Sequence, residues 1–144
     1  MPDKVFFDTN ILVYLANEDS SFSDRIEKKF REIIKTYGCE IYISRQILRE
    51  YAVVMTKPGI IENPLTPEEV VLDIEKWSEI FQVLDETEET TQVLLKLIKT
   101  YNIKGKKIHD ANIVATMIVN SIKNLFTLNI NDFKNFKEIQ LISI

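Results

Sequence analysis

Glycine, cysteine and histidine are scarce in this chain of 144 residues, and each scarcity excludes a class of site. The three glycines, Gly38, Gly59 and Gly105, stand far apart. This excludes the glycine-rich phosphate loops of dinucleotide-binding folds, Walker A ATPases and protein kinases. Cys39 is the one cysteine, so there is no internal disulfide. Cys39 and the one histidine, His109, are too few to build a structural zinc site.

Long hydrophobic runs and an excess of basic charge are also missing. No apolar stretch approaches the roughly 20 residues that a membrane-spanning helix needs. Asp8 and Asn10 interrupt the apolar N-terminal segment, which argues against a signal peptide. The net charge of −4 means that a nucleic acid would be held by local groups and not by a basic surface. We therefore expect a soluble cytoplasmic protein without membrane association, built as a single domain over residues 1–144.

Short hydrophobic runs alternate with segments of helical periodicity, and this alternation predicts the fold class. The runs predict buried strands at residues 5–7, 41–43, 81–84, 125–128 and 139–144. Between them we expect helices that start after Ser21 or Ser23, Ser44, Thr66 and Thr87, and one along residues 108–122. Strands that alternate with helices are typical of a three-layer α/β domain with a mostly parallel sheet.

Two of the helix signals make more detailed predictions. The sequence Thr66-Pro67-Glu68-Glu69 combines a capping residue, a proline at the first helical position and acids in the first turn. The periodicity after Thr87 predicts a helix whose core-facing residues are Thr91, Leu94, Leu95 and Ile98.

The order of the strands follows from the handedness of their connections. Crossovers between parallel strands are right-handed. If the first three strands extend the sheet in one direction and the chain then returns to the other side, the order is 3-2-1-4-5. The strand order then reverses between the first and fourth strands, and ligands of open α/β sheets bind at the carboxyl ends of the strands at such a point.

Four carboxylates from separate segments are expected to meet at this edge of the sheet. Asp8 ends the first strand and Asp132 follows the fourth. Glu50 lies about a turn and a half into the helix after the second strand. Asp110 starts the helix that leads to the fourth strand. Polar neighbours that could support these acids are Thr9, Asn10, Thr127 and Asn129.

Carboxylates that are packed together repel one another, and a divalent cation removes that conflict. All-oxygen ligands select Mg²⁺ or Mn²⁺, which can activate water for attack on a phosphodiester. Structural explanations remain open for single residues, since Asp110 suits the first turn of a helix and Asp132 suits a helix cap. Asp8 is harder to explain in this way, because it interrupts an apolar run where an unpaired charge is costly.

Four segments of the chain together resemble PIN-domain proteins, in particular the VapC-like ribonuclease toxins. They are Val5–Leu12, Ser44–Tyr51, Ile108–Ala111 with Ala115-Thr116, and Thr127–Phe133. The resemblance covers nearly the whole chain and implies a PIN-like α/β/α fold. It also implies an Mg²⁺- or Mn²⁺-dependent endoribonuclease that leaves 5′-phosphate and 3′-hydroxyl ends, forms a homodimer and is inhibited by a cognate antitoxin.

The resemblance assigns metal binding and catalysis to Asp8, Glu50, Asp110 and a fourth position. Some members of the family carry an acid where Asn129 stands, so the fourth ligand is either Asp132 or the neutral oxygen of Asn129. Candidate RNA contacts around Asp110 are Lys106, Lys107 and His109. Lysines beside Gly105 are also typical of a solvated loop.

Two alternatives remain open at this point. The first is a PIN-like module that binds RNA or a protein without catalysis. The second is a receiver or a haloacid-dehalogenase-like phosphotransferase, which also places an aspartate after the first strand. A phosphotransferase of that type needs an acid where Asn10 stands, and a receiver needs a lysine directly after a late strand, which the fourth strand does not supply.

Overall fold

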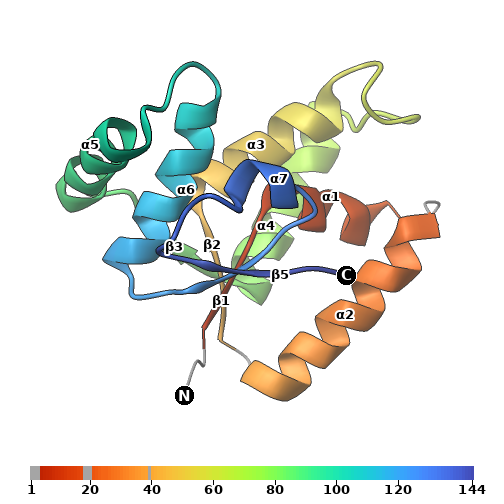
Figure 1. Ribbon diagram of the computed structural model, residues 1–144. Helices are drawn as coiled ribbons and strands as arrows, with labels where there is room; N and C mark the ends of the chain where they lie inside the picture. The colour runs from red at the N-terminus through yellow and green to blue at the C-terminus, as the bar shows by residue number, and fades with distance from the viewer. Residues whose placement is uncertain (1–3, 18–20, 39) are drawn as a thin grey trace.

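A computed structural model describes residues 4–17, 21–38 and 40–144, and its centre is a five-stranded sheet in which every pairing is parallel (Figure 1). The strands are β1 (Val5–Phe7), β2 (Ile41–Ser44), β3 (Gln82–Leu84), β4 (Asn124–Phe126) and β5 (Gln140–Ile142). Their order, β3-β2-β1-β4-β5, confirms the prediction. It differs from the 2-1-3-4-5 order of receiver domains, which excludes that alternative.

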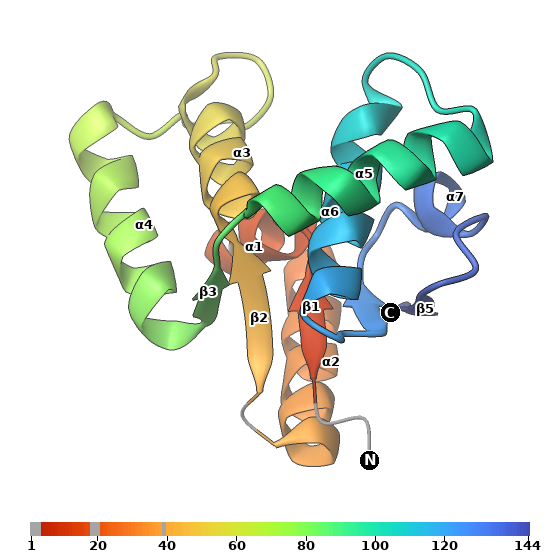
Figure 2. The same cartoon turned by 90° about the vertical axis from the view of Figure 1, so that its left-hand side faces the viewer.

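Seven helices within the described residues cover the two faces of the sheet. They are α1 (Thr9–Ala16), α2 (Ser21–Tyr37), α3 (Arg45–Thr56), α4 (Pro67–Ile80), α5 (Glu88–Tyr101), α6 (Lys107–Val119) and α7 (Ile130–Phe133). Helices α1 to α4 pack with one another on one face, and α5 to α7 lie on the other (Figures 1 and 2). Right-handed crossovers require this division, because the chain changes direction across the sheet after β3.

The structure confirms that helices begin directly after Thr66 and Thr87. The Thr66 hydroxyl accepts a hydrogen bond from the backbone N–H of Glu69, whose carboxylate accepts one from the backbone N–H of Thr66. Thr87 and Thr90 form the corresponding pair of bonds at the start of α5. Each reciprocal pair satisfies two N–H groups that a helix terminus leaves without a partner.

The helix start after Ser44 is confirmed as well: Ser44 is the N-terminal cap of α3, although its side chain forms no capping hydrogen bond with any described residue. The expectation that Ser23 caps α2 is wrong, because Ser23 is buried inside that helix. Helix α1 has no counterpart among the predicted helices, because Asp8 and Asn10 break the apolar pattern of this segment. In the structure Asp8 is the cap of α1: its Oδ1 accepts a 2.8 Å hydrogen bond from the Thr9 backbone N–H.

The predicted core-facing side of α5 is correct in part: Leu94 packs against the core and Ile98 is half-buried, but Thr91 and Leu95 do not face it. Thr90 and Leu97 are buried, whereas Thr91 is exposed and Leu95 is 59% exposed. Apolar residues between 93 and 98 occupy more than one side of this helix, so the pattern alone does not define which side faces the core. Thr90, which the sequence pattern did not select, is buried and also forms the capping pair at the start of the helix.

The central strand is the part of the sheet that positions the site. Val5, Phe6 and Phe7 have no exposed surface, and β1 pairs with β2 on one side and β4 on the other. Apolar burial on both faces fixes where β1 ends and therefore where Asp8 lies. Of the helices in the described part of the chain, none is both long and apolar enough to cross a membrane.

Candidate active site

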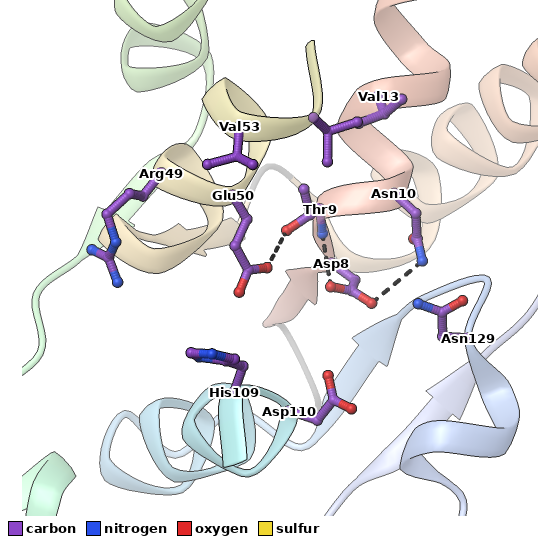
Figure 3. A pocket seen from close by; sticks show the side chains of 11 residues that line it. Asp8, Thr9, Asn10, Val13, Arg49, Glu50, Val53, His109, Asp110 and Asn129 are labelled. Carbon is purple, nitrogen blue, oxygen red and sulfur yellow. Dashed lines mark hydrogen bonds between the residues drawn. The ribbon is translucent and has the colours of Figure 1, made fainter. Parts of the chain in front are cut away.

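The carboxyl edge of the sheet opens into a pocket of about 480 Å³ between α1, α3 and α6 (Figure 3). Asp8 lies at its base, directly after β1, and Asp110 points toward Asp8 from the first turn of α6. Glu50 projects into the pocket from α3. The lining residues are Asp8, Thr9, Asn10, Val13, Arg49, Glu50, Val53, Val54, His109, Asp110 and Asn129.

Asp8 is only 5% exposed, and both of its carboxylate oxygens accept hydrogen bonds. Oδ1 accepts from the Thr9 backbone N–H at 2.8 Å, and Oδ2 accepts from the Thr127 hydroxyl at 2.7 Å and the Asn10 side-chain amide at 3.5 Å. Burial raises the pKa of Asp8 to about 6, and the bonds from Thr127 and Thr9 oppose this rise. The negative charges of Glu50 and Asp132 raise the pKa further.

Glu50 is held at both oxygens. Its Oε1 accepts a 2.8 Å hydrogen bond from the Thr9 hydroxyl, and its Oε2 accepts one of the same length from the Gln46 side-chain amide. Thr9 therefore contacts Asp8 through its backbone and Glu50 through its side chain. Thr9 is thus hydrogen-bonded to two of the four predicted acids.

Asp110 completes the group of acids that face the pocket. Partial burial raises its pKa to about 6, and the charges of Asp132, Asp8 and Glu50 raise it further, while Lys107 lowers it. The raised pKa values of Asp8 and Asp110 therefore come first from burial of the two carboxyl groups and second from repulsion among the acids.

The structure separates the two candidates for the fourth position. Asn129 lines the pocket, and its backbone N–H donates a 3.0 Å hydrogen bond to the Thr127 hydroxyl. Asp132 is exposed on α7 and does not line the pocket. Its charge nevertheless raises the pKa of both Asp8 and Asp110, so it lies on the same side of the molecule as the acids.

The donor set suits a hard divalent cation, although the side chains are not closed around one. No three His, Cys, Asp or Glu side chains within residues 4–17, 21–38 and 40–144 stand close enough together to hold a metal ion as they are. The oxygen donors that face the pocket are nevertheless those that Mg²⁺ and Mn²⁺ prefer. A cation among Asp8, Glu50 and Asp110 would offset both the burial and the repulsion that raise the pKa values of Asp8 and Asp110.

Among the candidate RNA contacts, only His109 lines the pocket. Lys106 is the exposed N-terminal cap of α6, and Lys107 is half-buried near Asp110. Sequence reasoning did not select Arg49 or the apolar wall of Val13, Val53 and Val54. It also overlooked Gln46, although its position four residues before Glu50 on a helix places the two side chains on one face.

Comparison with known proteins shows the family to which the chain belongs. The sequence pattern of the PIN domain matches residues 5–139. The chain belongs to the PIN domain family. This PIN domain is 25% identical over 137 residues to Ribonuclease VapC48 of Mycobacterium tuberculosis, an alignment that covers 94% of this chain and 93% of the relative.

Solved structures share the fold of this PIN domain at lower sequence identity. VapBC2 from Rickettsia felis, solved bound to a DNA fragment from the promoter, gives a TM-score of 0.70 at 20% identity, covering 97% of this chain and 98% of that chain. VapC20 of Mycobacterium tuberculosis, described as a sarcin-ricin loop cleaving toxin, gives a TM-score of 0.69 at 13% identity. The match covers 94% of this chain and 98% of that chain.

Proposed function

We propose that this PIN domain is a metal-dependent endoribonuclease and the toxin of a toxin–antitoxin pair. One observation carries the proposal: the buried carboxylate of Asp8 faces Glu50 and Asp110 across one pocket at the switch point of a PIN-type sheet. Burial makes the ionised form of Asp8 costly, as its raised pKa shows, which favours a functional reason for an acid at this place. The similarity to Ribonuclease VapC48 supports RNA as the substrate.

Mg²⁺ or Mn²⁺ would be held by Asp8, Glu50 and Asp110, with either Asn129 or Asp132 at the fourth position. Such a cation would neutralise the carboxylates, attract the phosphodiester and lower the pKa of a bound water. Hydrogen bonds from Thr127 and Thr9 lower the pKa of Asp8 and so favour the ionised carboxylate that a cation binds.

Other side chains of the pocket face the substrate. Arg49 lies on the wall beside Glu50, where its guanidinium can pair with a phosphate next to the scissile one. His109 stands on the opposite wall beside Asp110, and a ring N–H can donate to a sugar or phosphate oxygen. Water attack on the phosphorus with departure of the 3′ oxygen leaves 5′-phosphate and 3′-hydroxyl ends.

The experiment that tests the proposal is cleavage of a mixed small-RNA pool with Mn²⁺ and with EDTA. The wild type is compared with Asp110→Asn, and with Asp24→Asn as a control that makes the same chemical change on exposed α2. We expect Mn²⁺-dependent cleavage that is lost in Asp110→Asn and kept in Asp24→Asn. RNA that binds with equal affinity to all three proteins but is never cut would favour the non-catalytic module instead.

The partners follow from the same family relationship. Solved neighbours include VapBC2 from Rickettsia felis and a toxin–antitoxin complex from Klebsiella pneumoniae, which supports an antitoxin partner. We also propose a homodimer that acts in the cytoplasm. Light scattering on the purified chain, alone and after co-expression with the product of an adjacent short reading frame, tests both partner assignments.

A further inference from the structure

Gln46 is a buried amide at the junction of α3 and α6. Only 2% of its surface is exposed. Its Nε2 donates 2.8 Å hydrogen bonds to Glu50 Oε2 and to the backbone carbonyl of His109, and its Oε1 accepts a 2.8 Å bond from Asn112 Nδ2. Burying an amide is costly unless its polar atoms are paired, and here both ends of the amide are paired.

The partners of Gln46 belong to both walls of the pocket. Glu50 is on the same helix, one turn later, whereas His109 and Asn112 belong to α6. The carbonyl of His109 belongs to the residue that precedes Asp110 in the first turn of α6. The Gln46 side chain therefore holds the carboxylate of Glu50 and also binds the backbone of the helical turn that carries Asp110.

The orientation of the Gln46 amide is determined by its neighbours. Glu50 and the His109 carbonyl can only accept hydrogen bonds, so the Gln46 nitrogen must face them. Asn112 directs its own nitrogen to the Gln46 oxygen, and the same nitrogen donates to Glu86 in the segment between β3 and α5. The acceptor Glu86 thus sets the direction of the chain of bonds that ends at Glu50.

We propose that Gln46 is a positioning residue for the metal site, an inference that rests on the proposed nuclease function. A lysine or arginine at this position would neutralise the Glu50 carboxylate. The neutral amide of Gln46 holds the carboxylate in place and leaves its charge. Thr9 holds the other oxygen, so the plane of the carboxylate is fixed from two sides. Groups that orient metal ligands in this way commonly contribute 10-fold to 100-fold to metal affinity or activity.

The test compares Gln46→Met, which keeps the shape of the side chain and removes its hydrogen bonds, with Gln92→Met, the same change on the exposed side of α5. Mn²⁺ affinity is measured by calorimetry, and RNA cleavage is measured as a function of Mn²⁺ concentration. We expect Gln46→Met to weaken the Kd for Mn²⁺ at least about tenfold and to raise the Mn²⁺ concentration for half-maximal cleavage by a similar factor. Gln92→Met should match the wild type.

A second variant keeps the proposal testable if Gln46→Met does not fold. Asn112 is half-buried, so Asn112→Ala removes the partner that orients Gln46 without opening the core. It should weaken Mn²⁺ binding severalfold. If both variants lose melting temperature but bind Mn²⁺ as the wild type does, Gln46 only stabilises the fold and the inference is wrong. If the wild type itself neither binds Mn²⁺ nor cleaves RNA, the proposed function fails first.

Discussion

The hydroxyl of Thr127 donates a 2.7 Å hydrogen bond to Asp8 Oδ2, and this bond joins the carboxyl ends of two neighbouring strands. The bond exists because β1 and β4 pair in parallel with Phe7 opposite Phe126, so the next residue of each strand emerges at the same edge. Both residues are buried, Thr127 completely. A hydrogen bond to a buried carboxylate is among the stronger interactions of a fold.

Thr127→Val should therefore destabilise the protein at neutral pH. The change keeps the shape of the side chain and removes the donor that lowers the pKa of Asp8. The loss should be on the order of 2 kcal/mol in the free energy of unfolding at pH 8, where Asp8 is ionised. It should shrink at pH 4.5, where Asp8 is protonated. Urea denaturation in EDTA measures both values.

The matched control for this experiment is Thr100→Val on the exposed side of α5. It should change the unfolding free energy little at either pH. A loss for Thr127→Val that is the same at pH 4.5 and pH 8 would mean that the hydroxyl stabilises this edge through packing or the bond it accepts from the Asn129 backbone N–H, and not through its bond to ionised Asp8.

The pKa values of Asp8 and Asp110 predict an unusual pH dependence for the metal-free protein. Both are raised from 3.8 to about 6, so the folded state holds protons that the unfolded chain has already released. Their contribution to stability is full below pH 4 and is lost as the pH rises through 6. The charges of Glu50 and Asp132 raise the pKa of Asp8 and of Asp110 further, and Lys107 lowers the pKa of Asp110.

Asp8→Asn tests how much the ionisation of Asp8 lowers the stability of the metal-free protein. In EDTA at pH 7.5 the variant should have a higher melting temperature than the wild type, because it lacks the buried charge. Added Mn²⁺ should reverse the order, since it stabilises the folded state that binds it. Differential scanning fluorimetry at pH 5 and 7.5, with and without Mn²⁺, measures the differences. Equal Mn²⁺ shifts for the two proteins would mean that Asp8 is not a principal ligand.

The sequence predicted the edge at which the acids meet because the rules of strand connection are strong. Short apolar runs located the strands, and right-handed crossovers then placed Asp8, Glu50 and Asp110 together. Helix α1 was missed because Asp8 and Asn10, the polar residues that serve the pocket, break its apolar pattern. Conflicts of this kind between local pattern and fold are expected where residues serve function.

Hydrogen-bond partners were the least predictable feature. Gln46 reaches α6 through two bonds that depend on how two helices from opposite faces of the sheet approach each other. No spacing in the sequence encodes that approach. The same limitation applies after β4, where only the short helix α7 decides whether Asn129 or Asp132 faces the pocket.

The fourth position can be decided by two variants, Asn129→Ala and Asp132→Asn. Asn129 lines the pocket and Asp132 does not, so we expect Asn129→Ala to weaken Mn²⁺ binding more. Asp132→Asn should act mainly through charge: it removes a repulsion that raises the pKa of Asp8 and Asp110. Calorimetry with Mn²⁺ at pH 7.5 measures the affinities, and urea denaturation in EDTA measures the effect of the charge.

Asn131→Ala, an exposed neighbour of Asp132 on α7, is the control for local disturbance of that helix. It should leave Mn²⁺ affinity unchanged. Asp132→Asn should raise the stability of the metal-free protein at pH 7.5, because the remaining acids then ionise at lower cost. A loss of Mn²⁺ binding in Asp132→Asn that exceeds the loss in Asn129→Ala would instead assign the fourth ligand to Asp132, and α7 would have to turn toward the pocket when the ion binds.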